Sequence, residues 1–384
     1  MLSLQSRTAF LSLMAGLFYV LFPWVSKKFG KRKTLVLMLS LFAISTISLT
    51  LFVKVSSSSG RWFIWEQSFQ LWKHNWLAGV GLGRFNPEFN HLQAGYFSGT
   101  SLYSKEAMLA NDGYFAFNEW FHFAIELGIA GLVLSLVSTY IILKACFRNI
   151  NSSKSWAGTM LMPVFVGCLF SYPLHNFYIL SITCLLVGYL SKGYALSLTH
   201  ISPKFKLVLL LAMLTTLFFY SYQYIKNQEQ FSEGKQLARE GYKTEAINIS
   251  AQISSEMKKD YGFTIFYLNL LYDTRRLERA IDWFHKFHRW HCNQRIHSVV
   301  AKCYDEKGDF NKAEEHYLIS LYLTPHLLQS RIDLMEFYSR YDKVGKARYW
   351  AGEALHYPAK VQNNKVEMIK KRAQNYLLFT TETK

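Results

Sequence analysis

The chain alternates between long apolar runs and short polar turns over its first 225 residues, and it is amphipathic and charged after that. A helix of roughly 17–25 apolar residues is long enough to cross a bilayer. Six runs approach that length, and they cover residues 8–25, 35–53, 121–143, 157–174, 176–191 and 206–224. The pattern predicts an all-α fold in which residues 1–225 form a polytopic membrane helix bundle of six spans.

Charge sets the expected orientation of these spans. Residues 1–225 contain 17 Lys and Arg but only 6 Asp and Glu. Eleven of the basic residues lie in three turns, at residues 27–33, 144–154 and 192–206, and these turns contain no acid. Because basic residues are enriched on the cytoplasmic side of membrane proteins, we expect the three turns to be cytoplasmic. The N-terminus, the loop 54–120 and residues 226–384 are then expected outside.

The net charge of +17 is interpreted as this topology signal. Nucleic-acid binding is a poor interpretation, because no basic stripe with stacking aromatic residues faces a single compartment. A transporter is also disfavoured, because the spans lack the interrupted helices and midplane charges of a substrate pathway. No spacing of cysteine and histidine typical of a metal site occurs.

Residues 226–384 carry an internal repeat. Alanine recurs at spacings of 34, 33 and 34 residues, at Ala246, Ala280, Ala313 and Ala347. In the clearest unit, residues 296–325, the pattern predicts two helices around a turn at Gly308-Asp309, with small residues where the helices meet and aromatic residues between them. This unit resembles a tetratricopeptide repeat. We therefore expect a periplasmic α-solenoid of tetratricopeptide-like helix pairs that docks a protein partner.

Three arginines lie next to spans or glycine-rich turns. A guanidinium group offers a planar fork of donors that suits phosphate oxygens. Arg7 and Arg61 are expected at the same membrane face, where two such groups suffice to clamp a diphosphate. The alternative for Arg61 is an interfacial arginine beside aromatic residues, and the two interpretations are about equally favoured. Arg84 ends the run Gly79-Val80-Gly81-Leu82-Gly83, which predicts a turn that brings backbone close to another segment.

A second group of polar residues lies at the outer end of the third span. Asn118, His122 and Glu126 recur every four residues and share one helix face. Ionisable residues inside a span are a functional hypothesis by default, although polar residues at a span's end often only hold a neighbouring helix. His91 and His175 are further candidates for a general base, because imidazole titrates near neutral pH. A polar loop histidine without a role is the more common case.

These motifs, in this order, resemble the O-antigen ligase and O-antigen polymerase superfamily. The resemblance covers residues 5–190 and rests on Ser6-Arg7-Thr8-Ala9, Gly60-Arg61, the glycine run, Asn118-Glu119 and Glu126-Leu127-Gly128. It implies a glycosyltransferase of the bacterial inner membrane that takes a glycan from undecaprenyl diphosphate on the periplasmic side. It implies no metal, nucleotide sugar or other cofactor. A C-terminal tetratricopeptide array also occurs in such proteins.

The resemblance also implies roles for individual residues. Arg7 and Arg61 would hold the donor diphosphate, with Arg84 in support. Asn118 matches the asparagine of the family's His-Asn pair, and the histidine of that pair, the proposed base for the acceptor hydroxyl, is Phe117 here. His122, Glu119 or His91 would then be the catalytic residue. The acceptor would be lipid A-core or a growing glycan, and the motifs do not separate ligase from polymerase.

A second departure from the family is the number of spans. Family members usually have more spans, and the missing ones would precede Met1. Both departures favour an alternative hypothesis, in which the chain is a catalytically inactive, membrane-anchored tetratricopeptide scaffold. The pair of arginines favours the enzyme.

Overall fold

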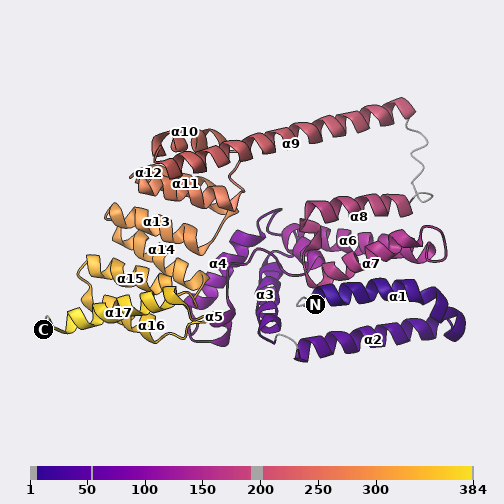
Figure 1. Cartoon of the computed structure of the whole chain (residues 1–384), viewed down its shortest axis with the longest axis horizontal. Coiled ribbons are helices and arrows are strands. Elements are labelled where there is room, and N and C mark those ends of the chain that lie inside the picture. Colours follow the sequence, from indigo (N-terminus) through magenta and orange to yellow (C-terminus); the bar gives the residue numbers. More distant parts are fainter. Residues whose placement is uncertain (1–6, 53–54, 192–201, 383–384) are drawn as a thin grey trace. The chain divides into compact units, whose positions relative to one another are not determined.

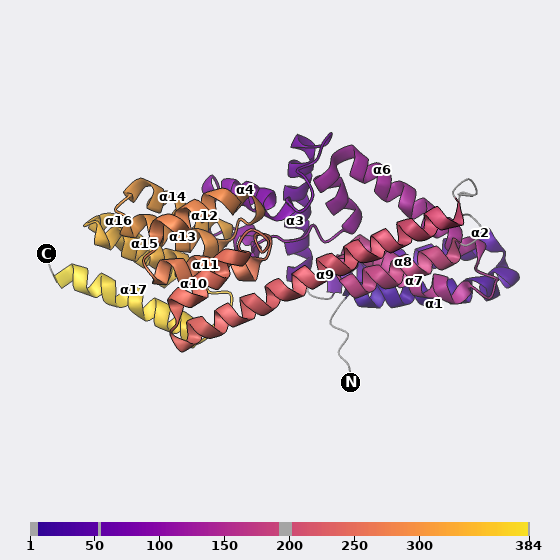
Figure 2. The ribbon, with the colours of Figure 1, turned by 90° about the horizontal axis from the view of Figure 1, so that it is seen from above.

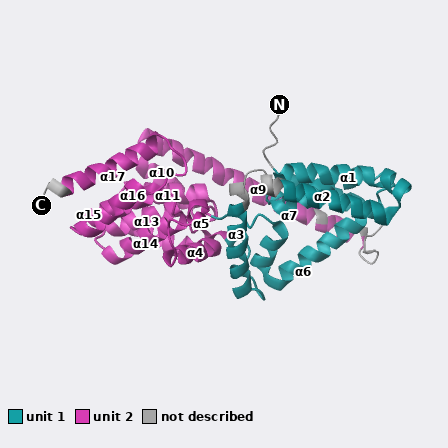
Figure 3. Cartoon of the chain, turned by 90° about the horizontal axis from the view of Figure 1, so that it is seen from below, with its two compact units in different colours: residues 1–85, 113–200 teal, residues 86–112, 201–384 magenta. Residues whose placement is uncertain are grey.

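The computed structural model describes residues 7–52, 55–191 and 202–382, which form helices joined by turns, with no β-strand among them (Figure 1). The predicted all-α class is confirmed. The chain divides into two compact units (Figure 3). Unit 1 comprises residues 1–85 and 113–200, and unit 2 comprises residues 86–112 and 201–384. The predicted boundary between membrane and exported parts at residue 225 is a different division, and it stays a prediction.

Unit 1 contains the apolar helices of the N-terminal half. They are α1 (Arg7–Phe29), α2 (Lys31–Phe52), α3 (Val55–His74), α6 (Glu119–Arg148), α7 (Ser155–Phe170), the 3-10 turn η1 (Pro173–His175) and α8 (Phe177–Leu190). Helix α7 packs against α1, α6 and α8. Glycine permits the contact with α1, because a Cβ atom at Gly158 would lie 2.2 Å from the Tyr19 hydroxyl oxygen. That hydroxyl donates to the Cys146 carbonyl of α6 at 2.7 Å, so small residues and one buried hydrogen bond join three helices.

Three helical segments of the described chain are long and apolar enough to cross a membrane. They are α1, α6 and residues Leu207–Glu240 of α9 (Pro203–Glu240). The first two contain the predicted spans 8–25 and 121–143, and the third contains all but the first residue of the predicted span 206–224. The predicted spans 157–174 and 176–191 form α7 and α8, which have only 16 and 14 residues. The predicted span 35–53 forms most of α2, while residue 53 lies outside the described residues. A count of six spans therefore stays a prediction.

Unit 2 contains two helices from the loop 54–120 and all helices from α9 onward. They are α4 (Phe85–Ser98), α5 (Lys105–Leu109), α9, α10 (Lys243–Ile253), α11 (Tyr261–Asp273), α12 (Leu277–Phe287), η3 (His288–Trp290), α13 (Gln294–Glu306), α14 (Phe310–Leu323), α15 (Leu328–Arg340), α16 (Val344–His356) and α17 (Asn364–Glu382). Helix α9 is one continuous rod (Figure 2). From α9 onward, successive helices pack in pairs, and each pair packs on the next.

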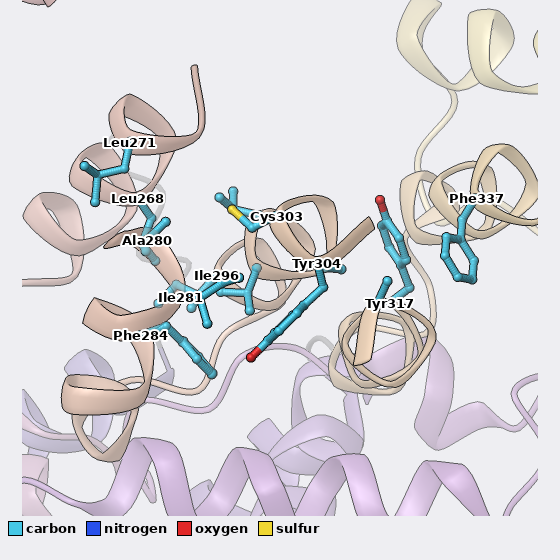
Figure 4. Packing of buried hydrophobic residues seen from close by; sticks show 14 of the residues in the cluster. Leu268, Leu271, Ala280, Ile281, Phe284, Ile296, Cys303, Tyr304, Tyr317 and Phe337 are labelled. Carbon is cyan, nitrogen blue, oxygen red and sulfur yellow. The ribbon is translucent and has the colours of Figure 1, made fainter. Parts of the chain in front are cut away.

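The repeated alanines explain why the helices of unit 2 pair. Each lies in the second helix of a pair, in α10, α12, α14 and α16, and all four are fully buried. Figure 4 shows Ala280 beside Phe284 and the large rings of Tyr304, Tyr317 and Phe337 in the same cluster. Small residues allow the helix axes to approach, and rings fill the spaces between pairs. The predicted helices of residues 296–325 and their Gly308 turn (φ 78°) are confirmed.

Residues 86–112 belong to unit 2 because buried amides hold them there. The Asn90 side chain donates to the Cys292 carbonyl at 2.6 Å. The Gln93 side chain donates to the Leu323 carbonyl at 2.8 Å. The carboxylate of Asp112 accepts hydrogen bonds from the Asn293 side chain and from the backbone of Gln294. Buried polar groups with satisfied partners fix one arrangement, so this part of the loop 54–120 folds with the helix pairs.

Candidate functional site

Arg61 projects from α3 and is anchored at the end of α7. Its Nη1 donates to the Phe170 carbonyl at 2.9 Å and to the Thr8 hydroxyl at 3.5 Å. The last carbonyls of a helix have no partner within that helix, so the guanidinium satisfies one of them. The group also lies over the Phe117 ring, 5.1 Å from its centroid. These contacts hold the guanidinium group in place.

Arg7 and Arg61 lie close enough for their charges to interact. Burial lowers the pKa of the half-buried Arg61 guanidinium, and the positive charge of Arg7 lowers it further. No carboxylate in the described part of the chain lies within salt-bridge distance of Arg61. The structure therefore brings together the two arginines that the sequence paired, in a setting that favours an anion. Arg84 follows the glycine run and lies beside Gly81, and its role in donor binding stays a prediction.

The glycine run packs against a break in α6. Gly128 has φ 63° and ψ −143°, which no helix accommodates. The break leaves the Ile125 and Glu126 carbonyls without helical partners, and the amides of Val80 and Gly81 donate to them at 3.0 and 2.9 Å. The close backbone approach predicted for the glycine run is confirmed. The expectation of uninterrupted spans is wrong for residues 121–143, because the break lies inside that run.

The same break separates the polar start of α6 from its apolar part. Residues 129–148 continue as straight helix for about 30 Å at ~1.5 Å per residue, which matches the apolar thickness of a bilayer. Asn118 caps the polar segment: its side-chain oxygen accepts from the Phe121 amide at 2.9 Å, and its nitrogen donates to the Leu169 carbonyl at 3.1 Å. The Asn118 oxygen thus caps α6, and its nitrogen holds α6 to α7. Its role in substrate binding stays a prediction.

Glu119 and His175 form a pair at the start of α6. The Glu119 side chain is fully buried, and its Oε1 accepts from the Leu174 amide at 2.7 Å. Its Oε2 lies 3.1 Å from His175 Nδ1, while the His175 side chain stays 33% exposed. This Glu119 oxygen is buried and has no aligned hydrogen-bond donor among the described residues, so the two groups are in contact at ion-pair distance. A buried carboxylate here supports an imidazole that solvent can reach.

His122 and Glu126 form a second, deeper pair one turn further along α6. His122 Nε2 lies 3.5 Å from Glu126 Oε1, and both side chains are buried. Glu126 Oε1 also accepts from the Phe85 amide at 3.3 Å. The buried His122 Nδ1 has no hydrogen-bond partner among the described residues. The predicted common face of α6 is therefore real, but it buries His122 and Glu126 against Phe85.

Three aromatic rings, those of Phe115, Phe117 and Tyr172, form a strip of contacts from Arg61 to His175, called the aromatic strip below. Phe115 stacks on Tyr172 with centroids 4.1 Å apart, and it meets His175 at 4.5 Å. Phe117 meets Tyr172 at 5.5 Å on the side of Arg61. Phe117 has φ 52°, a conformation that a bulky residue rarely adopts. The backbone is held in this strained state directly before the Asn118 cap, as often occurs at functional sites.

The predicted site residues fall into two groups. Arg7, Arg61, Asn118, Glu119 and His122 all lie in unit 1, where they surround the ends of α3, α6 and α7. His91 lies in α4 of unit 2, where its ring meets the His297 ring edge-on at 6.3 Å. The role of His91 as a base stays a prediction.

The partnership of His175 with Glu119 escaped the sequence analysis. The two residues are far apart in the chain, and no short motif links them. In the sequence, the turn Tyr172-Pro173-Leu174-His175 is recognisable only as a polar break between two apolar runs, and it does not indicate a partner for His175.

Comparison with known proteins adds one finding. No curated protein matches the chain. Residues 1–136 match a family described as O-antigen ligase. The matched range contains Arg7, Arg61, Asn118, Glu119 and His122, and it ends before His175. The N-terminal third of the chain is thus similar to O-antigen ligases, in agreement with the order of its motifs.

Proposed function

We propose that the chain transfers a glycan from undecaprenyl diphosphate to an acceptor hydroxyl on the periplasmic side of a bacterial inner membrane. The observation that carries the proposal is the proximity of Arg61, which binds the end of α7, to the charge of Arg7. Both arginines lie within the residues similar to O-antigen ligases. Two adjacent guanidinium groups suit a diphosphate, because each can donate to two of its oxygens at once.

The arginines would act on the leaving group. When the acceptor oxygen attacks the anomeric carbon of the donor sugar, the bond to the diphosphate breaks and negative charge grows on the leaving oxygen. Donors already aimed at that position stabilise the transition state without reorganisation. The bonds from Arg61 to Phe170 and Thr8 supply this preorganisation. Attack on the face opposite the diphosphate inverts the anomeric centre.

An apolar groove in the same unit as the arginines supports a lipid-linked donor. It encloses about 250 Å³ between α1, α2 and α7, and its wall includes Phe18, Phe42 and Leu169. Leu169 directly precedes Phe170, whose carbonyl binds Arg61. A polyprenyl chain is wholly apolar, so its burial against such a lining is favourable. The groove would hold the tail of the donor, and the arginines would hold its diphosphate. The acceptor, lipid A-core or a growing glycan, belongs to the same proposal.

The first test replaces Arg61. We expect Arg61→Ala to abolish surface-glycan transfer with the protein still present, because the leaving diphosphate loses its main donor. Arg61→Lys should retain part of the activity, because it keeps the charge but loses the fork. The measurement is a gel profile of surface glycans from chromosomal variants, with protein level followed by blot.

Lys73→Ala is the matched control, since Lys73 is an exposed basic residue of the same helix. Loss of long glycans together with accumulation of lipid-linked glycan would identify a ligase. Collapse of chain length, with single units still attached, would identify a polymerase. An unchanged profile in Arg61→Ala would refute the proposed function.

A second candidate is a membrane-anchored scaffold built on a tetratricopeptide-like array. The observation that favours it is a groove of about 780 Å³ within unit 2, formed mainly by the first helices of successive pairs. Four basic residues line it against one acid, Asp333; they are Arg295, Lys302, Lys360 and Lys365. Apolar positions such as Phe266 and Val299 lie among them. Such a lining fits an acidic peptide segment with apolar anchors.

Charge reversal tests the scaffold. We expect the double variant Arg295→Glu and Lys302→Glu of the full chain to lose proteins that co-purify with it, because the groove then repels an acidic segment. Lys286→Glu, an exposed residue of α12 outside the groove, is the control. Co-purification that survives the double variant would remove the groove from consideration.

A further inference from the structure

We propose that His175 is the general base that deprotonates the acceptor hydroxyl, and that Glu119 is the positioning residue that orients it. The inference rests on the proposed function and adds its catalytic base. His175 lies outside the residues matched to O-antigen ligases, and the expected family histidine is Phe117 in this chain. The base is therefore supplied from a different element, the turn η1 between α7 and α8.

Access to substrate separates His175 from the other candidates. A general base must come within hydrogen-bond distance of the proton that it removes. The Glu119 side chain is completely buried, and only 5% of His122 is exposed. His175 keeps a third of its side chain exposed. Among the acidic and imidazole groups that the structure gathers here, His175 is the one that an acceptor can reach.

The Glu119 contact selects the useful form of the His175 ring. Glu119 Oε2 faces Nδ1 at 3.1 Å, so the carboxylate favours a proton on Nδ1. The lone pair then lies on Nε2, on the other side of the ring. A carboxylate that fixes the tautomer and stabilises the imidazolium is the arrangement that activates hydroxyl nucleophiles in hydrolases. The Leu174 amide donates to the other carboxylate oxygen, Oε1, and so fixes the Glu119 side chain.

The aromatic strip connects the base to the diphosphate site. Arg61 lies over Phe117, Phe117 meets Tyr172, and Tyr172 meets His175 at 6.2 Å. Phe115 covers the far end of the strip, at 4.5 Å from His175. Sugar rings present apolar C–H faces, and aromatic side chains are the usual lining of ligand sites. A sugar on this strip would have its diphosphate near Arg61 and its acceptor near His175.

The proposed reaction moves one proton to His175, forms one glycosidic bond and breaks the bond to the diphosphate. The acceptor O–H bond breaks, and its proton passes to His175 Nε2. The acceptor oxygen forms a bond to the anomeric carbon, and the carbon–oxygen bond to the diphosphate breaks. The electron pair of that bond leaves with undecaprenyl diphosphate, beside Arg61 and Arg7. The imidazolium then releases its proton to water, and His175 returns to its starting form.

The test uses purified full-length protein in detergent, with the lipid-linked glycan fraction and acceptor of the native strain. We expect His175→Ala to lower kcat by about 10²–10⁴-fold, the usual contribution of a general base. KM for the lipid-linked glycan and inhibition by undecaprenyl diphosphate should stay unchanged, because the arginines remain. Added imidazole should restore part of the rate. The acidic limb of the kcat–pH profile should disappear.

Two further variants separate chemistry from structure. Glu119→Gln keeps a side-chain oxygen for the Leu174 amide but lacks the charge, so kcat should fall less than in His175→Ala, with KM unchanged. His74→Ala, an exposed histidine of α3 in the same unit, should behave like the wild type.

The possible outcomes are distinct. A normal rate in His175→Ala would overturn this inference and leave the arginine site standing. Joint loss of rate and undecaprenyl diphosphate inhibition, without imidazole rescue, would make His175 structural and would also overturn the inference. A wild-type protein without transfer, or transfer that survives Arg61→Ala unchanged, would overturn the proposed function itself.

Discussion

A single methyl group added at Gly128 is expected to break the junction between α6 and the glycine run, and the candidate site with it. A Cβ atom at Gly128 would lie 2.4 Å from the Leu77 carbonyl oxygen, which is backbone and cannot swing away. The residue also has φ 63°, where any side chain adds strain. Backbone strain of this kind costs about 1–3 kcal/mol before the clash is counted. We therefore expect Gly128→Ala to destabilise unit 1 by about 3 kcal/mol or more.

Gly79→Ala should have the same effect, because it lies on the other side of the same junction. A Cβ atom there would approach the Glu126 carbonyl oxygen to 2.2 Å, and Gly79 has φ 72°. Since one junction is lost in either case, the double variant should be little worse than either single variant. Non-additive destabilisation would show that the two glycines serve one contact.

The measurement is a thermal melt in detergent, combined with hydrogen exchange at residues 79–84. Gly188→Ala in α8 is the control, because a Cβ atom there meets nothing within 4 Å. If Gly128→Ala melts at the wild-type temperature and residues 79–84 stay protected, the loop does not depend on the break in α6.

This junction marks the limit of what the sequence could predict. The spacing of glycines predicted a close backbone approach but not its partner. The run from Leu127 to Gly131 is apolar throughout, so hydropathy continues smoothly across the break. The break is stable only because Val80 and Gly81 donate to the carbonyls that it releases. Such compensation comes from a distant segment and leaves no trace in local periodicity.

In the candidate site, too, short motifs could be recognised from the sequence but contacts between distant segments could not. Arg7 and Arg61 could be paired from the sequence, because both follow from span positions and short motifs. The pair of Glu119 and His175 could not, because it arises where the start of α6 meets the turn after α7. His91 was predicted as a candidate base from its place in the loop 54–120. Buried amides at Asn90 and Gln93 tie that part of the loop to unit 2, a division that the sequence did not predict.

The helix pairs were the most predictable part of the fold. Their period rests on alanines that pack between helices close in sequence, so local spacing carries the information. Polar residues between the pairs were less predictable. His297 and His316 lie in α13 and α14, yet both are buried, and their Nδ1 atoms lie 2.9 Å apart. These buried imidazoles are expected to make the stability of unit 2 depend on pH.

Acidification is expected to destabilise unit 2 between pH 6.5 and pH 4. Burial, together with the nearby charges of His285 and Lys312, lowers the pKa of His316 to about 4. Burial and the neighbouring His316 lower the pKa of His297 well below 6.5. Above pH 6.5 both histidines are neutral in the folded and unfolded states, so they add no pH dependence. As the pH falls below 6.5, the unfolded chain takes up protons that the folded chain does not, and the stability decreases.

The geometry explains why this pair resists protonation. One neutral imidazole can donate its Nδ1–H to the other, and His297 Nε2 meets the Cys292 sulfur at 3.6 Å. Two imidazolium ions would place two donors and two like charges at 2.9 Å. His316 also stacks on the Tyr304 ring at 5.6 Å, away from water. At pH 4 the shift of His316 alone corresponds to a loss of about 3 kcal/mol.

Hydrogen exchange of the full chain as a function of pH measures the effect locally. We expect protection of α13 and α14 to fall from pH 6.5 to pH 4 while α6 keeps its protection. His316→Phe can retain the stack on Tyr304 and removes one titrating group, so it should flatten the pH dependence even if it lowers stability at pH 7. His356→Gln, an exposed histidine of α16, should leave the profile unchanged. Equal protection of α13 at pH 7 and pH 4 would mean that these imidazoles are open to water in the folded protein.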